Sequence, residues 1–170
     1  MKLGDERLTK RLMTIARDFY ARPQAAVPQA CRTRANTKAV YRFFDHPETD
    51  METLLSQHNA ATVNRCKAES VVLAVQDTTS LNYSAHPATA DLGLIGYRTN
   101  GGIGLLVHDT MAFNSEGTPL GLLDVQSWAR NPDDFGKKHK RHDLHIEEKE
   151  SHKWLKSYEK VARADRKSVV

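Results

Sequence analysis

The strongest candidate for chemistry in this sequence is one aspartate just after an apolar run. Asp77 stands in AVQDTTSLNY, beside the hydroxyl groups of Thr78, Thr79 and Ser80. Metal-dependent phosphoryl transfer needs carboxylates on rigid elements, because Mg²⁺ binds hard oxygen ligands in a strict geometry. A strand-borne aspartate meets that need. An aspartate that caps the turn leaving the strand would look the same, and the residues alone leave both interpretations open.

A second candidate set is basic and lies in the first third of the chain. Residues 1–44 contain ten Lys or Arg and three Asp or Glu, a net charge of +7, whereas the whole chain carries +4. This segregation favours contact with a polyanion, with a solvated helix surface as the alternative. Lys and Arg neutralise phosphates, and Arg and Asn also read base edges. The residues that we predict to contact DNA are Arg7, Lys10, Arg11, Arg34, Asn36, Lys38, Tyr41 and Arg42.

Three helices are predicted in this part of the chain, and the basic set lies on the first two. Residues 5–21 have helical apolar spacing, and the Pro-containing segment ARPQAAVPQA that follows is typical of a linker. A second helix is predicted over residues 34–44 and a third over about 50–66. Thr49 and Glu52 have the spacing of a capping box at the start of the third helix.

The pattern changes to strands at residue 70. The continuous apolar run SVVLAVQD (70–77) indicates a strand covered on both faces. Residues 104–113 and 120–129 predict two more strands, joined by the turn NSEGTP as an antiparallel hairpin. A helix is predicted over about 146–164, with its buried stripe formed by Trp154, Leu155, Tyr158, Val161 and Ala162.

Five segments resemble one family in the same order along the chain. They are LGDERLTKRL, AVYRFFDHP, QDTTSLNY, PLGLLDVQSWARNP and IEEKESHKWL. QDTTSLNY after an apolar strand resembles the first-aspartate motif of the cut-and-paste DDE transposases, and the set resembles insertion-sequence family four, which includes the transposon-five-type transposase. The resemblance covers most of residues 3–160.

The resemblance implies an α+β chain. A helical DNA-binding domain (1–66) would precede the first half of a ribonuclease-H-like fold (70–170), with three antiparallel strands and a helix. It implies that Asp77 is the first of three carboxylates that bind Mg²⁺ in a two-metal phosphoryl-transfer site. The implied partner is double-stranded DNA from transposon terminal repeats.

The sequence departs from the family where the other two carboxylates are expected. Asp165-Arg166 follows a helical stretch and no apolar strand, so we do not assign Asp165 as the second ligand. We therefore expect a truncated site that is inactive alone, with strand 70–77 left as an exposed apolar edge. Two alternatives are a non-catalytic, sequence-specific DNA-binding protein (a repressor or decoy) and a second transposase chain that supplies the missing carboxylates.

The sequence also indicates the cellular compartment of the protein. The first residues contain no apolar signal segment, and no window approaches the length of a membrane span. Cys31 and Cys66 are far apart and are expected to be reduced thiols. The sequence therefore predicts a cytoplasmic protein without a membrane partner.

Overall fold

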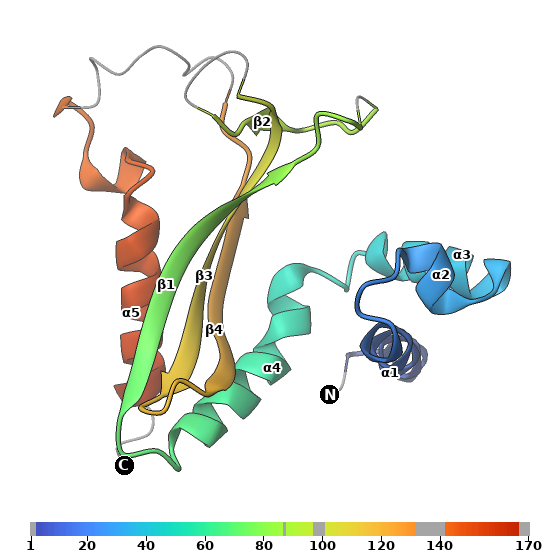
Figure 1. Ribbon diagram of the computed structural model, residues 1–170, viewed down its shortest axis with the longest axis horizontal. Helices are drawn as coiled ribbons and strands as arrows, with labels where there is room; N and C mark the ends of the chain where they lie inside the picture. The colour runs from blue at the N-terminus through green and yellow to red at the C-terminus, as the bar shows by residue number, and fades with distance from the viewer. Residues whose placement is uncertain (1–2, 87, 97–100, 132–141, 167–170) are drawn as a thin grey trace. The chain divides into compact units, whose positions relative to one another are not determined.

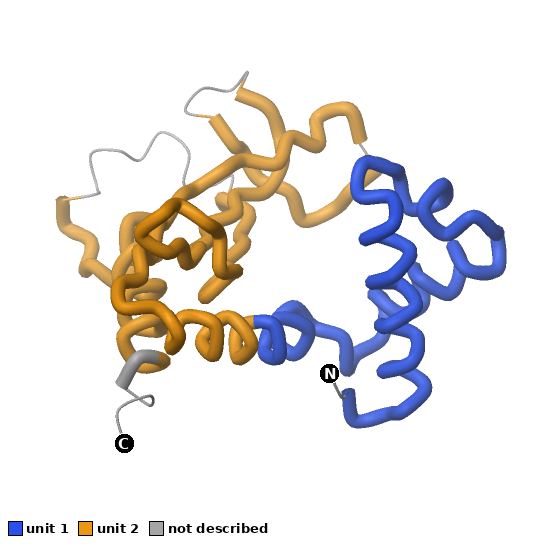
Figure 2. Tube along the Cα trace, turned by 60° about the horizontal axis from the view of Figure 1, so that its bottom comes forward, with its two compact units in different colours: residues 1–58 blue, residues 59–170 orange. Residues whose placement is uncertain are grey.

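The computed structural model describes residues 3–86, 88–96, 101–131 and 142–166. The chain forms two compact units, residues 1–58 and 59–170 (Figure 2). The division falls inside helix α4 (Met51–Cys66), whereas the sequence placed a domain boundary after that helix. One helix thus contributes residues to both units.

The first unit is built on helices α1 (Glu6–Ala21), α2 (Val27–Cys31) and α3 (Arg34–Phe44) (Figure 1). The N-cap side chains are Asp5 for α1 and Thr33 for α3, each accepting a backbone N–H of the first turn. Helices α1 and α3 therefore begin and end close to the predicted residues. The buried core of this unit consists of Leu3, Ile15, Cys31, Val40 and Phe43.

Two local predictions in this unit were wrong. Helix α2 lies inside the predicted linker, because Pro28 occupies the first turn of a helix, where its missing N–H is not needed. The cap of α4 is Asp50, whose carboxylate accepts the backbone N–H of Thr53 at 2.8 Å. Thr49 is buried instead, and its hydroxyl donates to the carbonyls of Phe43 and His46. Thr49 thus closes the turn after α3 and does not start α4.

The second unit contains one antiparallel sheet. Its strands are β1 (Val72–Asn82), β2 (Gly93–Leu94), β3 (Ile103–Asn114) and β4 (Pro119–Trp128). Strands β1 and β4 pair with the same central residues of β3, so they lie on its opposite edges. The predicted β3–β4 hairpin is confirmed, and Gly117 takes the positive φ of its turn. Strand β2 was not predicted.

The two faces of the sheet differ in what covers them. Directly opposed residues of antiparallel strands share a face, and successive residues alternate between faces. His108 of β3 packs against Trp154 of helix α5 (His152–Arg166), so the residues that share its face lie towards α5. On the other face, Leu73 and Val75 of β1 are each 50% exposed. The prediction that β1 is covered on both faces was therefore wrong, because α5 covers one face only.

Within the described residues, β3 is the only strand that pairs with β1. Strand β1 is accordingly an edge strand whose outer face exposes apolar side chains. This agrees with the expected exposed apolar edge.

Helix α5 contacts the sheet through Trp154 and through a set of polar residues. A short 3₁₀ turn, η3 (Ile146–Glu148), precedes it, so the predicted single helix is interrupted. Trp154, Leu155 and Tyr158 are 44%, 39% and 64% exposed, whereas Ser157 is completely buried. The predicted apolar stripe was wrong for Leu155 and Tyr158, because the sheet presents polar side chains that need polar partners, whereas Trp154 packs against His108 of β3.

Asp124 of β4 is the centre of this polar contact. Its buried carboxylate accepts hydrogen bonds from Ser157 Oγ and Lys160 Nζ, each at 2.6 Å. Gln126 Nε2 donates to Ser157 Oγ at 2.8 Å. Burial would raise the pKa of Asp124, but the hydrogen bonds from Lys160 and Ser157 outweigh it and hold that pKa below its usual value. The ionised carboxylate fixes α5 on β4.

The whole chain is α+β, with a helical first unit and an antiparallel sheet in the second. Among the described residues, none of the helices combines the length and apolar character needed to cross a bilayer.

Candidate functional site

A groove between helices α1 and α3 gathers four of the predicted DNA-contacting residues. Arg7 and Arg11 lie on the α1 wall, and Lys38 and Arg42 lie on the α3 wall. Its remaining lining consists of Leu8, Ala35, Ala39, Phe43 and His46. The groove therefore combines cationic walls with a small apolar floor.

Helical spacing explains why the cations form rows. Arg7 and Arg11 are four residues apart on α1, as are Lys38 and Arg42 on α3, and such pairs lie on one helix face. Each row spans about 6 Å along its helix. Packing of α1 against α3 through Phe43 and neighbouring core residues brings the two rows to one groove.

Two of the residues predicted to contact DNA, Arg7 and Lys10, form ion pairs with carboxylates that partly neutralise their positive charge. Arg7 donates to Asp5 at 3.0 Å, which raises the pKa of Arg7 and lowers the pKa of Asp5. Lys10 pairs with Glu6 at 2.9 Å and does not line the groove. Arg7 is 92% exposed despite its pairing, so a phosphate can still reach it.

The other predicted residues lie outside the groove lining. Asn36 uses its side-chain amide to donate to the carbonyl of Cys31 at 3.3 Å, and its backbone N–H donates to Thr33. Arg34 is exposed in the first turn of α3, and Tyr41 is 52% exposed. Asn36 thus has a structural role in this unit, whereas Arg34 and Tyr41 are accessible on its surface.

His46 is a groove residue that the sequence reasoning missed. It follows Arg42 by four residues and so extends the Lys38–Arg42 row beyond the end of α3. Its Nδ1 accepts the backbone N–H of Glu48 at 3.3 Å, which orients the ring in the turn. The continued spacing of four was the signal in the sequence that could have identified it.

Asp77 lies in the middle of β1 and is exposed. The strand continues to Asn82, so the alternative that Asp77 caps the turn leaving the strand was wrong. Asp77 is directly opposite Asp109 of β3, on the sheet face away from α5. Two carboxylates on neighbouring strands therefore lie on the sheet face that α5 does not cover. This face also carries the exposed Leu73 and Val75, and we call it the half-open face.

The donor chemistry around Asp77 suits a hard cation. Mg²⁺ is commonly bound by one or two carboxylates together with water and substrate phosphates. Asp77 and Asp109 supply oxygen donors of that kind, and no cluster of three or more His, Cys, Asp or Glu residues occurs in the described part of the chain. Asp77 and Asp109 thus have the donor chemistry of Mg²⁺ ligands, and a complete site would need further oxygen ligands.

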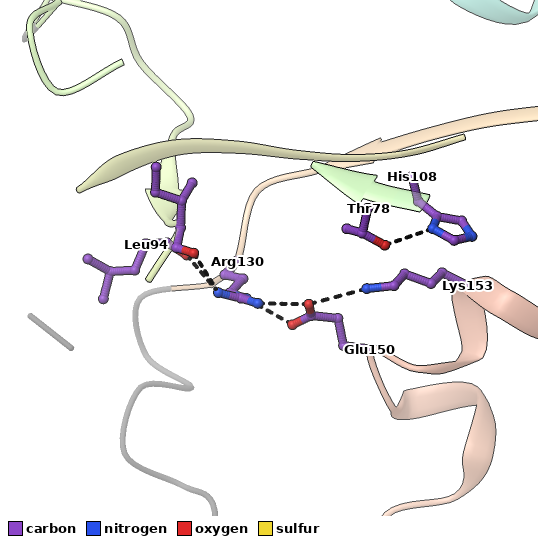
Figure 3. A network of polar contacts seen from close by, with 7 residues as sticks. Thr78, Leu94, His108, Arg130, Glu150 and Lys153 are labelled. Atoms are coloured by element: carbon purple, nitrogen blue, oxygen red, sulfur yellow. Dashed lines mark hydrogen bonds and ion pairs between the residues drawn. The ribbon is translucent and has the colours of Figure 1, made fainter. Parts of the chain in front are cut away.

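A polar network anchors the segments around the sheet (Figure 3). Arg130 makes two hydrogen bonds of 2.8 Å to the Glu150 carboxylate and also donates to the carbonyls of Leu94 and Ile95. Lys153 Nζ lies 3.7 Å from the same carboxylate. Arg130 thereby links the end of β4 to β2 and to the start of α5.

A comparison with known families concerns the first unit. Residues 1–49 match the family model described as transposase DNA-binding. The matched segment contains α1, α2, α3 and every residue that lines the basic groove. The match supports a transposase N-terminal region, with DNA as its partner.

Proposed function

We propose that this chain recognises transposon-end duplex DNA through the α1–α3 groove and belongs to the DDE type of insertion-sequence family four. The observation that carries the DNA-binding part is the placement of Arg7, Arg11, Lys38 and Arg42 around one groove in a segment that matches transposase DNA-binding regions. The two cationic rows fit a phosphate backbone, since basic side chains release condensed counterions when they neutralise phosphates.

We further propose that the second unit is the first half of a ribonuclease-H-like domain and that Asp77 is its first metal-binding carboxylate. The three long antiparallel strands β1, β3 and β4 are followed by helix α5, and Asp77 lies at the centre of β1; both features support this assignment. A bound Mg²⁺ would supply charge stabilisation at a phosphodiester and an activated water or 3′ hydroxyl. In this scheme Asp77 holds the cation on the half-open sheet face, and Asp109 is placed to bind it from β3.

Selection from a random duplex library tests sequence recognition by the full chain. We expect an enriched motif whose binding weakens on Arg42→Gln, while Arg17→Gln, on an exposed part of α1 outside the groove, leaves binding unchanged. No enrichment at low salt, or equal losses for both variants, would contradict recognition through this groove.

Mn²⁺ titration followed by amide NMR tests the metal assignment. Mn²⁺ should broaden signals around Asp77 selectively, and Asp77→Asn should remove that selectivity. Uniform broadening in both proteins would refute the metal-binding role of Asp77.

A second candidate function is that of a DNA-binding repressor or decoy without catalysis. It is favoured by the family match, which covers the groove helices and is described as transposase DNA-binding. A reporter gene placed behind the selected DNA motif discriminates the two functions. Repression that Arg42→Gln relieves and Asp77→Asn leaves intact supports this candidate, and failure to repress excludes it.

A further inference from the structure

His108 makes two side-chain hydrogen bonds to β1. The imidazole is completely buried, with Nδ1 at 2.8 Å from Thr78 Oγ1 and Nε2 at 3.1 Å from Gln76 Oε1. Its ring also packs edge-on against Trp154 of α5, with centroids 4.6 Å apart. One side chain of the central strand therefore joins the edge strand and the helix, and Figure 3 shows its bond to Thr78.

The two partners of His108 are the immediate neighbours of Asp77. Gln76 and Thr78 point to the α5 face, so Asp77 between them points to the opposite face. Because β1 pairs with a strand along one edge only, its backbone is less constrained than that of β3. Bonds to both flanking residues restrain the two peptide groups that orient Asp77.

The hydrogen bonds also define the protonation of the ring. The Gln76 Oε1 atom can only accept, so Nε2 carries a proton, and in the neutral ring Nδ1 accepts from the Thr78 hydroxyl. The ring is held in one tautomer with both nitrogens engaged.

We propose that His108 is a positioning residue for Asp77, holding Gln76 and Thr78 so that the carboxylate between them is presented for cation binding. This inference rests on the proposed metal-binding role of Asp77. The competing explanation is that His108 only attaches α5 to the sheet through Trp154. The two explanations differ in whether cation affinity changes when the bonds to β1 are removed without loss of the fold.

The test uses the full chain and Mn²⁺ alone as the probe. His108→Leu removes both bonds to β1. Thr78→Val removes one of them and keeps the shape of the threonine side chain, so Thr78→Val is the test variant if His108→Leu does not fold. Ser157→Ala is the matched control, because it removes a buried hydrogen bond beneath α5 that does not involve residues beside Asp77. His108→Gln can accept from Thr78 and donate to Gln76 and is the rescue variant.

We expect His108→Leu to weaken Mn²⁺ binding at Asp77 by about tenfold, the lower end of losses caused by removing groups that orient metal ligands. Ser157→Ala should leave that affinity unchanged, and His108→Gln should recover much of it. In the metal-free chain, the amide order parameter of Asp77 should fall in His108→Leu and not in Ser157→Ala.

The outcomes separate this inference from the proposed function. If Asp77→Asn leaves Mn²⁺ binding unaltered, the metal-binding role of Asp77 fails and the inference fails with it. If Asp77→Asn weakens binding but His108→Leu and Thr78→Val behave like Ser157→Ala, the inference alone is overturned.

Discussion

The salt dependence of DNA binding gives the most quantitative test of the α1–α3 groove. Four permanent cations line the groove: Arg7, Arg11, Lys38 and Arg42. If each neutralises one phosphate, the slope of log K against log salt should be about −3.6, since each contact contributes about −0.9 on duplex DNA. Raising the salt from about 50 to about 200 mM should then weaken binding about 150-fold.

Replacing one groove cation should change the slope as well as the affinity. Arg42→Gln leaves three cations and an expected slope of about −2.7, so the same salt increase should weaken binding only about 40-fold. Arg7 shares its charge with Asp5 at 3.0 Å, so its replacement should have the smallest effect of the four.

Fluorescence anisotropy of a labelled duplex, titrated with the full chain over a series of salt concentrations, measures these slopes. Arg17→Gln is the control, because this exposed cation of α1 does not line the groove. Circular dichroism checks that the helices are intact in each variant. An unchanged slope for Arg42→Gln, or an equal change for Arg17→Gln, would refute the groove as the phosphate-binding surface.

Four other changes have defined outcomes. Asp5→Asn keeps a capping oxygen on α1 and frees Arg7, so DNA affinity should rise in the same anisotropy assay, and a loss would contradict the pairing. The pKa of Asp124 is lowered on folding, so its contribution to stability is complete above the ordinary pKa of about 3.8 and is lost as the pH falls through the lower folded value. Asp124→Asn should remove this loss of stability at acid pH, measured by urea unfolding followed by tryptophan fluorescence. An unaltered pH profile of stability would contradict the stabilising role of the Asp124 carboxylate. Thr49→Val should lower the free energy of unfolding by about 1 kcal/mol, which should appear as faster amide hydrogen exchange in α3. Unchanged exchange rates would show that the hydrogen bonds of Thr49 do not stabilise this unit. Gly104→Ala would drive Cβ into the backbone oxygen of Leu81 in β1, so it should destabilise the sheet by about 1–3 kcal/mol, and an unshifted urea midpoint would contradict this close approach.

Elements defined by local signals were predictable from the sequence. Helices α1 and α3 have apolar stripes and capping residues within a few positions, and the β3–β4 hairpin has a turn with Gly117 at positive φ. These features depend on neighbours in sequence, so no knowledge of distant contacts is needed.

Features that depend on distant pairing were not predictable. The face that α5 turns to the sheet follows from Asp124 and from its partners Ser157 and Lys160, which the sequence separates by more than 30 residues. The apolar stripe therefore gave Trp154 correctly but misplaced Leu155 and Tyr158, because the buried polar groups of the sheet require hydrogen-bond partners from α5.

In the candidate sites, too, single residues were predictable from local sequence, whereas their arrangement was not. Each groove cation was predicted singly from its charge and helical position, but their convergence with His46 depends on how α1 packs on α3. Asp77 was chosen by motif, whereas the role of His108 depends on the strand register that sets it opposite Thr78.

Helix α4 has a practical consequence for dissecting the chain. The division between the two units falls after residue 58 with no loop at that point, inside a helix that continues to Cys66. Proteases cleave extended backbone, so cutting at this division requires the helix to unwind first. A fragment that ends at residue 58 would leave carbonyls of α4 without their helical donors, whereas one that ends after residue 66 keeps the helix whole.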